Sequence, residues 1–183
     1  MKELSLNILD ITQNSITAGA TEIEILLAED AAGLLTLTVR DNGCGMSEEM
    51  VASVTDPFCT TRTTRKVGMG IPLLKLASEQ TGGALTIASK LGEGTSISAT
   101  FDTHSIDFTP LGDMVSTIVT LIAGAPQIDF RYLHTALDSQ VCLDTKMLRA
   151  ELGADVPLDA FEVLAWIREY LKEQNEIFGG MKL

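Results

Sequence analysis

The hexapeptide Asp41 to Met46, DNGCGM, most narrows the folds open to this chain, because one carboxylate precedes two glycines that a single residue separates. It follows the apolar run 34–40, whose partial alternation predicts a half-buried strand that ends at Asp41. Asp, Asn and Gly are also the usual residues of sharp turns. Taken alone, the hexapeptide indicates an ordinary turn, and only partners elsewhere in the chain can give it a further role.

A helix is predicted over residues 4–18, because apolar and small side chains recur there at three- and four-residue spacing. Gly19 is a natural stop for this helix. The same spacing places Asn7, Asp10 and Asn14 on a second stripe. All three side chains are short and carry an oxygen ligand, so this stripe is a candidate polar site.

The segments that follow predict a module of strands and helices. Alternation and turn residues indicate strands over 21–26, 34–40, 84–89 and 95–101, and helical spacing with capping residues indicates helices over 47–54 and 71–81.

The segment TTRTTRKVGMG, which ends at Gly70, supplies a local group of cations. It carries Arg62, Arg65 and Lys66 without an acid, and Gly68 precedes a predicted helix. The start of a helix and mobile cations both favour an anion such as a phosphate chain. A solvated loop with ordinary glycines is the alternative reading of this segment alone. The chain has no GxxxxGK[ST] loop, and GMG falls short of GxGxxG.

Several stretches occur in a characteristic order: the helix LDITQNSITAGATEIEI, the turn DNGCGM, the lid DPFCTTR, the pair VGMGIPLLK, and GEGTSISATF. Together they resemble the GHKL ATPase superfamily of DNA gyrase, ninety-kilodalton heat-shock chaperones, sensor histidine kinases and MutL mismatch-repair ATPases. The resemblance covers residues 4–101 and implies the α+β Bergerat fold. This fold is an α/β sandwich with a mixed, mostly antiparallel sheet and helices on one face.

The resemblance implies an ATP site built around the hexapeptide. Asp41 matches the aspartate that accepts a hydrogen bond from the adenine amino group. Gly43 and Gly45 match the glycines that let the backbone approach the base, and Met46 belongs to the same motif. Thr95 matches the hydroxyl residue that supports the adenine contact.

The resemblance also implies Mg²⁺ and a phosphate site. Asn14 matches the asparagine that holds Mg²⁺ against the triphosphate, as suits a hard cation with few protein oxygens. Asn7 is a candidate for the same water shell, with an ordinary surface asparagine as the alternative.

The lid segment is expected near the phosphates. Gly68 and Gly70 match the family's lid glycines, and Arg62 and Lys66 are candidate phosphate contacts.

The branch of the superfamily stays open. Asp10 lies four residues before Asn14, where gyrase-like and MutL-like members carry the glutamate that activates water, so Asp10 is the candidate catalytic residue. Support of a magnesium-bound water is its alternative role. Thr17 stands where histidine kinases usually carry the lysine of NAxK, whereas VGMGIPLLKLASEQTGG looks like a histidine kinase.

The expected function is therefore an ATP-binding protein that binds Mg²⁺ and ATP. It either hydrolyses ATP slowly or transfers the γ-phosphate to a separate partner protein. A nucleotide-sensing interaction module without chemistry and a serine kinase resembling the anti-sigma-factor regulators are the alternatives. His104 and His134 stand in no H-E-x-R-x-P context, so the chain shows no phosphoacceptor of its own.

Residues 104–183 are expected to form a small second α+β unit after an ATPase domain of residues 1–103. Helices are predicted over 113–123, from 144 and over 160–177, and strands over 128–132 and 140–143. The last helix has one apolar face, made by Phe161, Leu164, Ile167 and Leu171. That face either closes the core of this unit or docks a partner.

Charge and composition exclude some classes of binding partner. A net charge of −12 argues against nucleic acid and anionic membranes, which need a positive footprint. No apolar stretch is long enough to span a bilayer, and the N-terminus does not read as a signal peptide. Cys44 and Cys59 are expected to be small buried residues with free thiols. We therefore expect a cytoplasmic protein that binds ATP and a protein partner, with a homodimer left open.

Overall fold

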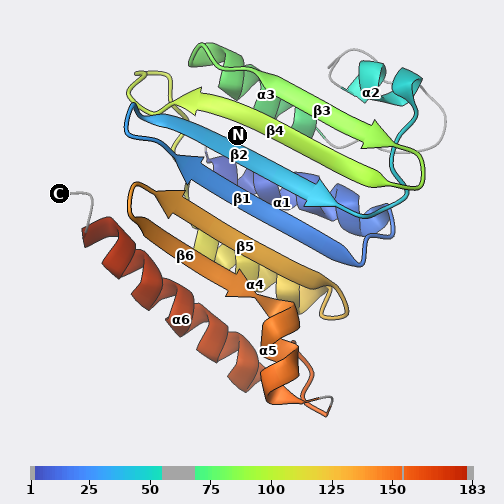
Figure 1. The fold of residues 1–183 in the computed structure, drawn as a ribbon, viewed down its shortest axis with the longest axis vertical. Coiled ribbons are helices and arrows are strands. Elements are labelled where there is room, and N and C mark those ends of the chain that lie inside the picture. The colour runs from blue at the N-terminus through green and yellow to red at the C-terminus, as the bar shows by residue number, and fades with distance from the viewer. Residues whose placement is uncertain (1–2, 55–68, 154, 181–183) are drawn as a thin grey trace.

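The computed structural model describes residues 3–54, 69–153 and 155–180, which form one sheet and the helices that cover it (Figure 1). The elements are α1 (Leu4–Thr17), β1 (Glu22–Glu29), β2 (Leu34–Asp41), α2 (Glu48–Val54), α3 (Gly70–Gln80), β3 (Leu85–Lys90), β4 (Gly94–Asp102), α4 (Met114–Gly124), β5 (Asp129–Ala136), β6 (Ser139–Asp144), α5 (Thr145–Leu152) and α6 (Phe161–Gly180). Every helix and strand predicted from the sequence is present, with ends that differ by a few residues.

The sheet has six strands in the order β3-β4-β2-β1-β5-β6. All neighbours are antiparallel except β1 and β5, which run parallel from the pair Glu22 and Asp129 to the pair Glu29 and Ala136. A parallel pair needs a long connection, and here the connection includes β2, β3 and β4. The predicted mixed, mostly antiparallel sheet is confirmed.

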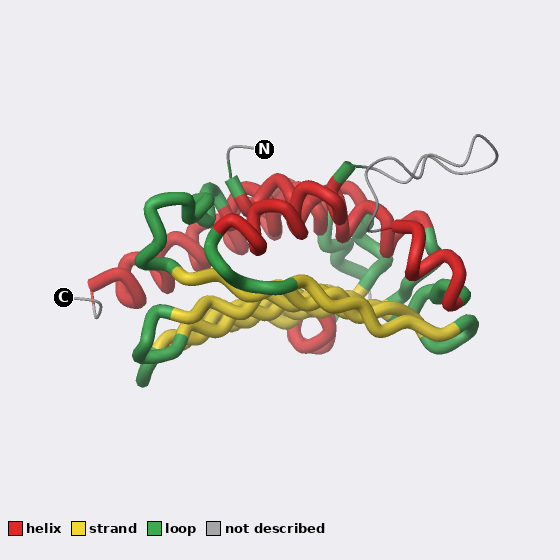
Figure 2. Tube along the Cα trace, turned by 90° about the horizontal axis from the view of Figure 1, so that it is seen from above, coloured by secondary structure: helices red, strands yellow, loops and turns green. Residues whose placement is uncertain are grey.

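Four helices form one layer on one face of the sheet, in the order α3, α1, α4, α6. Figure 2 shows this layer above the strands and a single helix below them, which is α5. We predicted helices on one face, and α5 is the exception to that prediction. None of the helices in the described ranges is long and apolar enough to cross a membrane.

Ion pairs with the outer face of the sheet hold α5. Arg149 Nε donates to Asp129 Oδ1 at 2.9 Å, and Lys146 Nζ donates to Glu22 Oε1 at 2.8 Å. The helix starts where expected, because the Asp144 carboxylate accepts hydrogen bonds from the N–H groups of residues 146 and 147. This outer position therefore follows from charges at the starts of β1 and β5, which a helical pattern does not show.

The core is continuous across the predicted boundary between residues 103 and 104. The strands β5 and β6 extend the same sheet, α4 packs against α1, and half of the buried apolar side chains in the described ranges come after residue 103. Whether either part folds by itself stays a prediction.

The buried face of α6 differs in one residue from the prediction. Ile167 and Leu171 are fully buried, but Phe161 is 81% exposed and Val163 is buried. Because α6 begins at Phe161, its first side chain lies before the stripe that meets the core.

Candidate functional site

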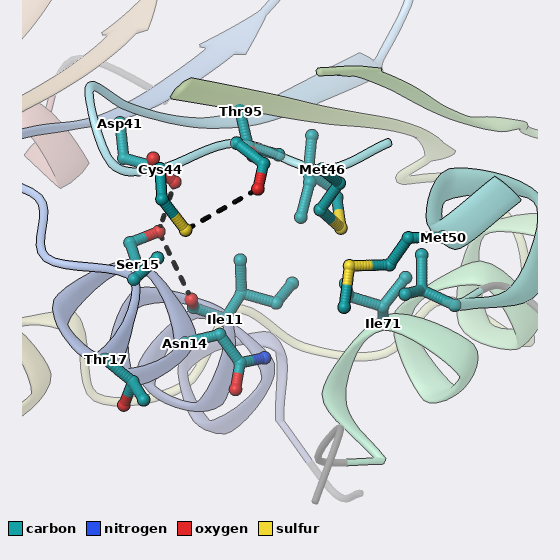
Figure 3. Close-up of a pocket in the computed structure, with 14 residues that line it drawn as sticks. Ile11, Asn14, Ser15, Thr17, Asp41, Cys44, Met46, Met50, Ile71 and Thr95 are labelled. Atoms are coloured by element: carbon teal, nitrogen blue, oxygen red, sulfur yellow. Dashed lines mark hydrogen bonds between the residues drawn. The ribbon is translucent and has the colours of Figure 1, made fainter. Parts of the chain in front are cut away.

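A pocket of about 340 Å³ lies between the helix layer and the end of the sheet, within the size range typical of ligand sites (Figure 3). It is formed by α1, the loop after β2, α2, the start of α3 and the start of β4. Five residues that the sequence predicted line it, namely Asn14, Asp41, Gly45, Met46 and Thr95.

Nine lining residues were not predicted for the site. They are Ile11, Ser15, Thr17, Ala18, Cys44, Met50, Val54, Ile71 and Ile97. Most of them are apolar and follow ordinary helix or strand periodicity. A pocket wall and a core face give the same sequence pattern, so the sequence does not distinguish these residues from core residues. Cys44 was expected to be buried, but it is exposed beside this pocket.

Asp41 is the polar centre of the pocket. The residue is only 9% exposed, and its two carboxylate oxygens have separate donors. Ser15 Oγ donates to Oδ2 at 2.6 Å, and the N–H of Gly43 donates to Oδ1 at 2.8 Å. A carboxylate has about four acceptor sites, so both oxygens can accept one further hydrogen bond. The Ser15 contact is drawn in Figure 3 and fixes how the carboxylate is turned.

Thr95 lies directly opposite Asp41 in the pairing of β2 with β4. Its hydroxyl is 2.8 Å from Ser89 Oγ, and Ser89 Oγ also accepts from Met46 N at 2.8 Å. Ser89 therefore joins three parts of the site, namely the hexapeptide loop, β3 and β4.

Gly45 of the hexapeptide and Gly94 of the turn before β4 are required by the protein's own packing. Gly45 has φ +66°, and a Cβ there would lie 2.0 Å from the carbonyl oxygen of Lys90. Gly94 has φ +97°, and its Cβ would lie 2.0 Å from the carbonyl oxygen of Asp41. The loop after β2 and the turn between β3 and β4 thus meet backbone to backbone. The approach of a base to Gly43 and Gly45 stays a prediction.

The two asparagines of α1 have different surroundings. Asn14 lines the pocket and lies on the side away from Asp41 (Figure 3). Asn7 is 2% exposed, which excludes the surface alternative, and it lies outside the pocket lining. With its amide turned, Asn7 accepts from Leu74 N and donates to the carbonyl of Glu3, both at 3.3 Å. Asn7 therefore joins α1 to α3.

Asp10 is exposed and lies beside the start of α3 rather than in the pocket lining. A Cβ built on Gly70 would lie 2.9 Å from Asp10 Cβ and 3.7 Å from Asp10 Oδ2. Gly70 is therefore needed for the close approach of α1 and α3. The Asp10 carboxylate thus lies near Gly70, the first residue of α3.

The remaining predicted residues, Arg62, Lys66 and Gly68, lie outside the described residues, as do Arg65 and Cys59. No lysine or arginine is among the described residues that line the pocket. Within the described ranges, no cluster of three histidine, cysteine or carboxylate side chains could hold a metal ion.

The sheet order, the helix layer and the pocket at the end of β2 define an α+β sandwich with a ligand site between helices and sheet. Residues 1–105 match the family described as Histidine kinase-, DNA gyrase B-, and HSP90-like ATPase. This match covers more than half of the chain, which belongs to this family of ATPases.

Several curated proteins are similar over part of the chain. A "Putative sensor protein" of Shewanella frigidimarina is 30% identical over 103 residues, 55% of this chain and 16% of that protein. A "Putative sensor histidine kinase NtrY-like" of Rickettsia conorii is 28% identical over 110 residues, 58% of this chain and 18% of that protein. The matched part is therefore less than a fifth of each of these two relatives.

A solved structure titled "Crystal Structure of N terminal domain of a DNA repair protein" has the same fold. Its TM-score is 0.54 at 15% identity, over 84% of this chain and 58% of that one. The resemblance to the GHKL superfamily is thus confirmed.

Proposed function

We propose that this chain binds ATP with Mg²⁺ in the pocket and that Asp41 recognises the adenine amino group. The geometry of Asp41 carries this proposal. Its carboxylate is nearly buried, held by Ser15 and by the N–H of Gly43, and keeps acceptor sites on both oxygens. An exocyclic amino group supplies the donor that these acceptor sites lack.

The other walls fit a purine. Ile11, Met50, Ile71 and Ile97 give the pocket an apolar lining, and Met46 and Met50 lie across it from Ser15 (Figure 3). A flat aromatic base gains from contact with aliphatic and thioether groups. Thr95, opposite Asp41, places a hydroxyl at the polar end of the same pocket.

For Mg²⁺, the described lining offers the Asn14 amide. One such oxygen suits Mg²⁺ only when phosphates and water complete the six ligands. Asn14 would therefore hold the ion together with the nucleotide, and the ion would neutralise phosphate charge. We assign the remaining phosphate contacts to the lid cations Arg62 and Lys66.

The γ-phosphate either goes to water or to a separate protein. His134 is buried and lies with its ring 4.4 Å from that of Phe178. His104 lies near Gly33, at the opposite end of β2 from Asp41, about 25 Å away for a strand of this length. Neither histidine lines the pocket, which favours transfer to a separate protein over transfer to His104 or His134 of the same chain.

Titration with ATP and Mg²⁺ tests the proposal. At about a hundred times the dissociation constant, ATP should add about 2.7 kcal/mol to the free energy of unfolding, which a rise in melting temperature detects. GTP at equal concentration should give a much smaller rise, because guanine lacks the amino group at that position. An equal response to both nucleotides would contradict the role of Asp41.

Ser15→Ala should weaken ATP binding about fivefold, because the Asp41 carboxylate loses the donor that orients it and one hydrogen bond is worth about 1 kcal/mol. Isothermal titration measures this change. Ser5→Ala is the matched control, since Ser5 is a buried serine of the same helix outside the pocket lining and should leave affinity unchanged. Unchanged affinity in Ser15→Ala would remove Ser15 from the site.

Asp10→Asn tests whether Asp10 is the general base of ATP hydrolysis. If Asp10 is the general base, this variant should lose phosphate release and keep ATP binding, because the amide retains size but not basicity. Asn14→Ala should instead lose the Mg²⁺ dependence of binding. Phosphate release at the parent rate in Asp10→Asn would exclude Asp10 as the general base, whereas no phosphate release from the parent chain would favour transfer to a partner protein or nucleotide sensing.

A further inference from the structure

One face of α6 carries a regular stripe of exposed side chains that the sheet does not use. Glu162, Trp166, Glu169, Glu173 and Glu176 follow one another at spacings of four, three, four and three residues, and all five are exposed. This spacing keeps side chains on one line of a helix. We call these five residues, with Tyr170 and Ile177 beside them, the α6 seam. It runs for about 23 Å.

The apolar part of the seam is large for an exposed helix. Trp166 is 52% exposed and Ile177 is 55% exposed. The rings of Trp166 and Tyr170 stack at 5.3 Å between centroids and 9° between planes. Tyr170 is fixed in turn, because its hydroxyl donates to the carbonyl of Cys142 in β6 at 2.9 Å. The seam therefore presents a rigid aromatic surface beside the edge of the sheet.

The charged part of the seam has one sign. Glu162, Glu173 and Glu176 form no ion pair with any residue in the described ranges, and Glu169 pairs only with Lys172, at 3.1 Å. Lys172 lies around the helix from the seam, toward Arg168, which donates to Ser116 of α4. Three of the four acids thus stand on solvent-facing positions beside an apolar stripe without a counter-charge among the described residues.

These charges decide which partner fits. A second copy packed along the same seam would bring two sets of four glutamates together, and like charges at an interface are unfavourable. A helix with lysine or arginine beside apolar side chains would satisfy both parts. Arginine also stacks on aromatic faces such as that of Trp166. We propose that the α6 seam docks a basic amphipathic helix of a partner protein.

The test uses the full chain and a synthetic peptide of about 21 residues, with leucine and arginine or lysine in heptad spacing. Trp166 is the only tryptophan of the chain, so its emission reports on the seam alone. We expect a saturable blue shift as the peptide covers the indole. A peptide with glutamate in place of its basic residues should give no shift.

Two variants with equal charge separate the seam from the overall acidity of the chain. The seam variant is E162Q/E169Q/E173Q/E176Q. The control removes the same charge from exposed helix positions elsewhere, as E48Q/E49Q/E79Q/E151Q. The seam variant should bind the peptide at least about tenfold more weakly, and the control should change affinity less than about twofold at physiological salt. Circular dichroism checks that both variants are folded. Ile177→Ser is a second seam variant, and the anisotropy of a labelled peptide measures how tightly it binds.

Equal weakening in both charge variants, or peptide binding without a change in Trp166 emission, would overturn the proposal. Dimers that form without peptide and dissociate in Trp166→Ala would assign the seam to a second copy and overturn it as well. ATP binding takes no part in these measurements, so their outcome is independent of the pocket.

Discussion

Asp41→Asn should remove half or more of the stabilisation by ATP and leave the fold intact. The amide can present a donor to the adenine amino group where an acceptor is needed, and an unpaired polar group in a nearly buried site costs about 1–3 kcal/mol. Ten- to a hundredfold weaker binding is the expected result. The thermal shift at a fixed ATP concentration measures it.

The fold should tolerate this change because both local partners can adapt. The N–H of Gly43 still has the amide oxygen as its acceptor, and the Ser15 hydroxyl can rotate to accept from the amide nitrogen. Asp102→Asn is the control, since this carboxylate lies at the other end of β4 and accepts from the N–H of residue 104. A full ATP shift in Asp41→Asn would remove Asp41 from base recognition.

A chain cut after residue 103 should not fold cooperatively, although the family match ends close to that point. The cut removes β5, β6, α4 and α6, and with them half of the buried apolar side chains of the described chain. Each buried aliphatic or aromatic side chain contributes about 1.5–3 kcal/mol, whereas a whole domain is stable by only about 5–15 kcal/mol. The cut also exposes the flanks of α1 and β1 that pack against α4 and β5, and the loss of a few such buried contacts is as large as this margin of stability.

Thermal unfolding followed by circular dichroism measures this result in the fragment 1–103 and in the full chain. The fragment should give no sharp transition, because the eight-residue strand β1 becomes an open edge and one flank of α1 loses α4. Met147→Ser is the control for this measurement, because Met147 lies on the exposed side of α5. This variant should unfold as the parent chain does. A cooperative transition in the fragment would establish an independent domain.

The periodicity of the sequence was enough to predict the elements, and the resemblance to the GHKL superfamily predicted the sheet class. Alternation gave β1, β2 and β4, and capping residues such as Asp144 marked helix starts correctly. The parallel pairing of β1 with β5 was not predictable from local pattern, because a strand that is buried between neighbours reads the same whichever strand lies beside it. For the same reason the sequence did not show that residues 104–183 extend the sheet of residues 1–103, and whether they fold alone stays a prediction.

Site residues that belong to a sequence motif could be predicted, whereas site residues that are placed only by packing could not. Asp41 and Thr95 belong to recognisable stretches, and the sheet places them opposite each other. Ser15 read as one more small residue on a buried helix face, yet it donates to Asp41. Asn7 shares the stripe of Asn14, but α3 lies over it, so Asn7 is buried outside the pocket lining, and its part in binding stays a prediction.

The parallel pair of β1 and β5 also sets the order of events when the chain is made. Glu24 and Arg131, joined across these strands, are 107 residues apart, so the centre of the sheet cannot close until most of the chain has been synthesised. Until then β1 has one unpaired edge, and the helix that carries Asn14 and Ser15 lacks a neighbour. Long-range pairing of this kind slows folding and prolongs the exposure of apolar surface. The residues that line the pocket are therefore all synthesised before the strand and the helix that cover the flanks of β1 and α1, so we expect the pocket to be stabilised only after β5 and α4 have been added.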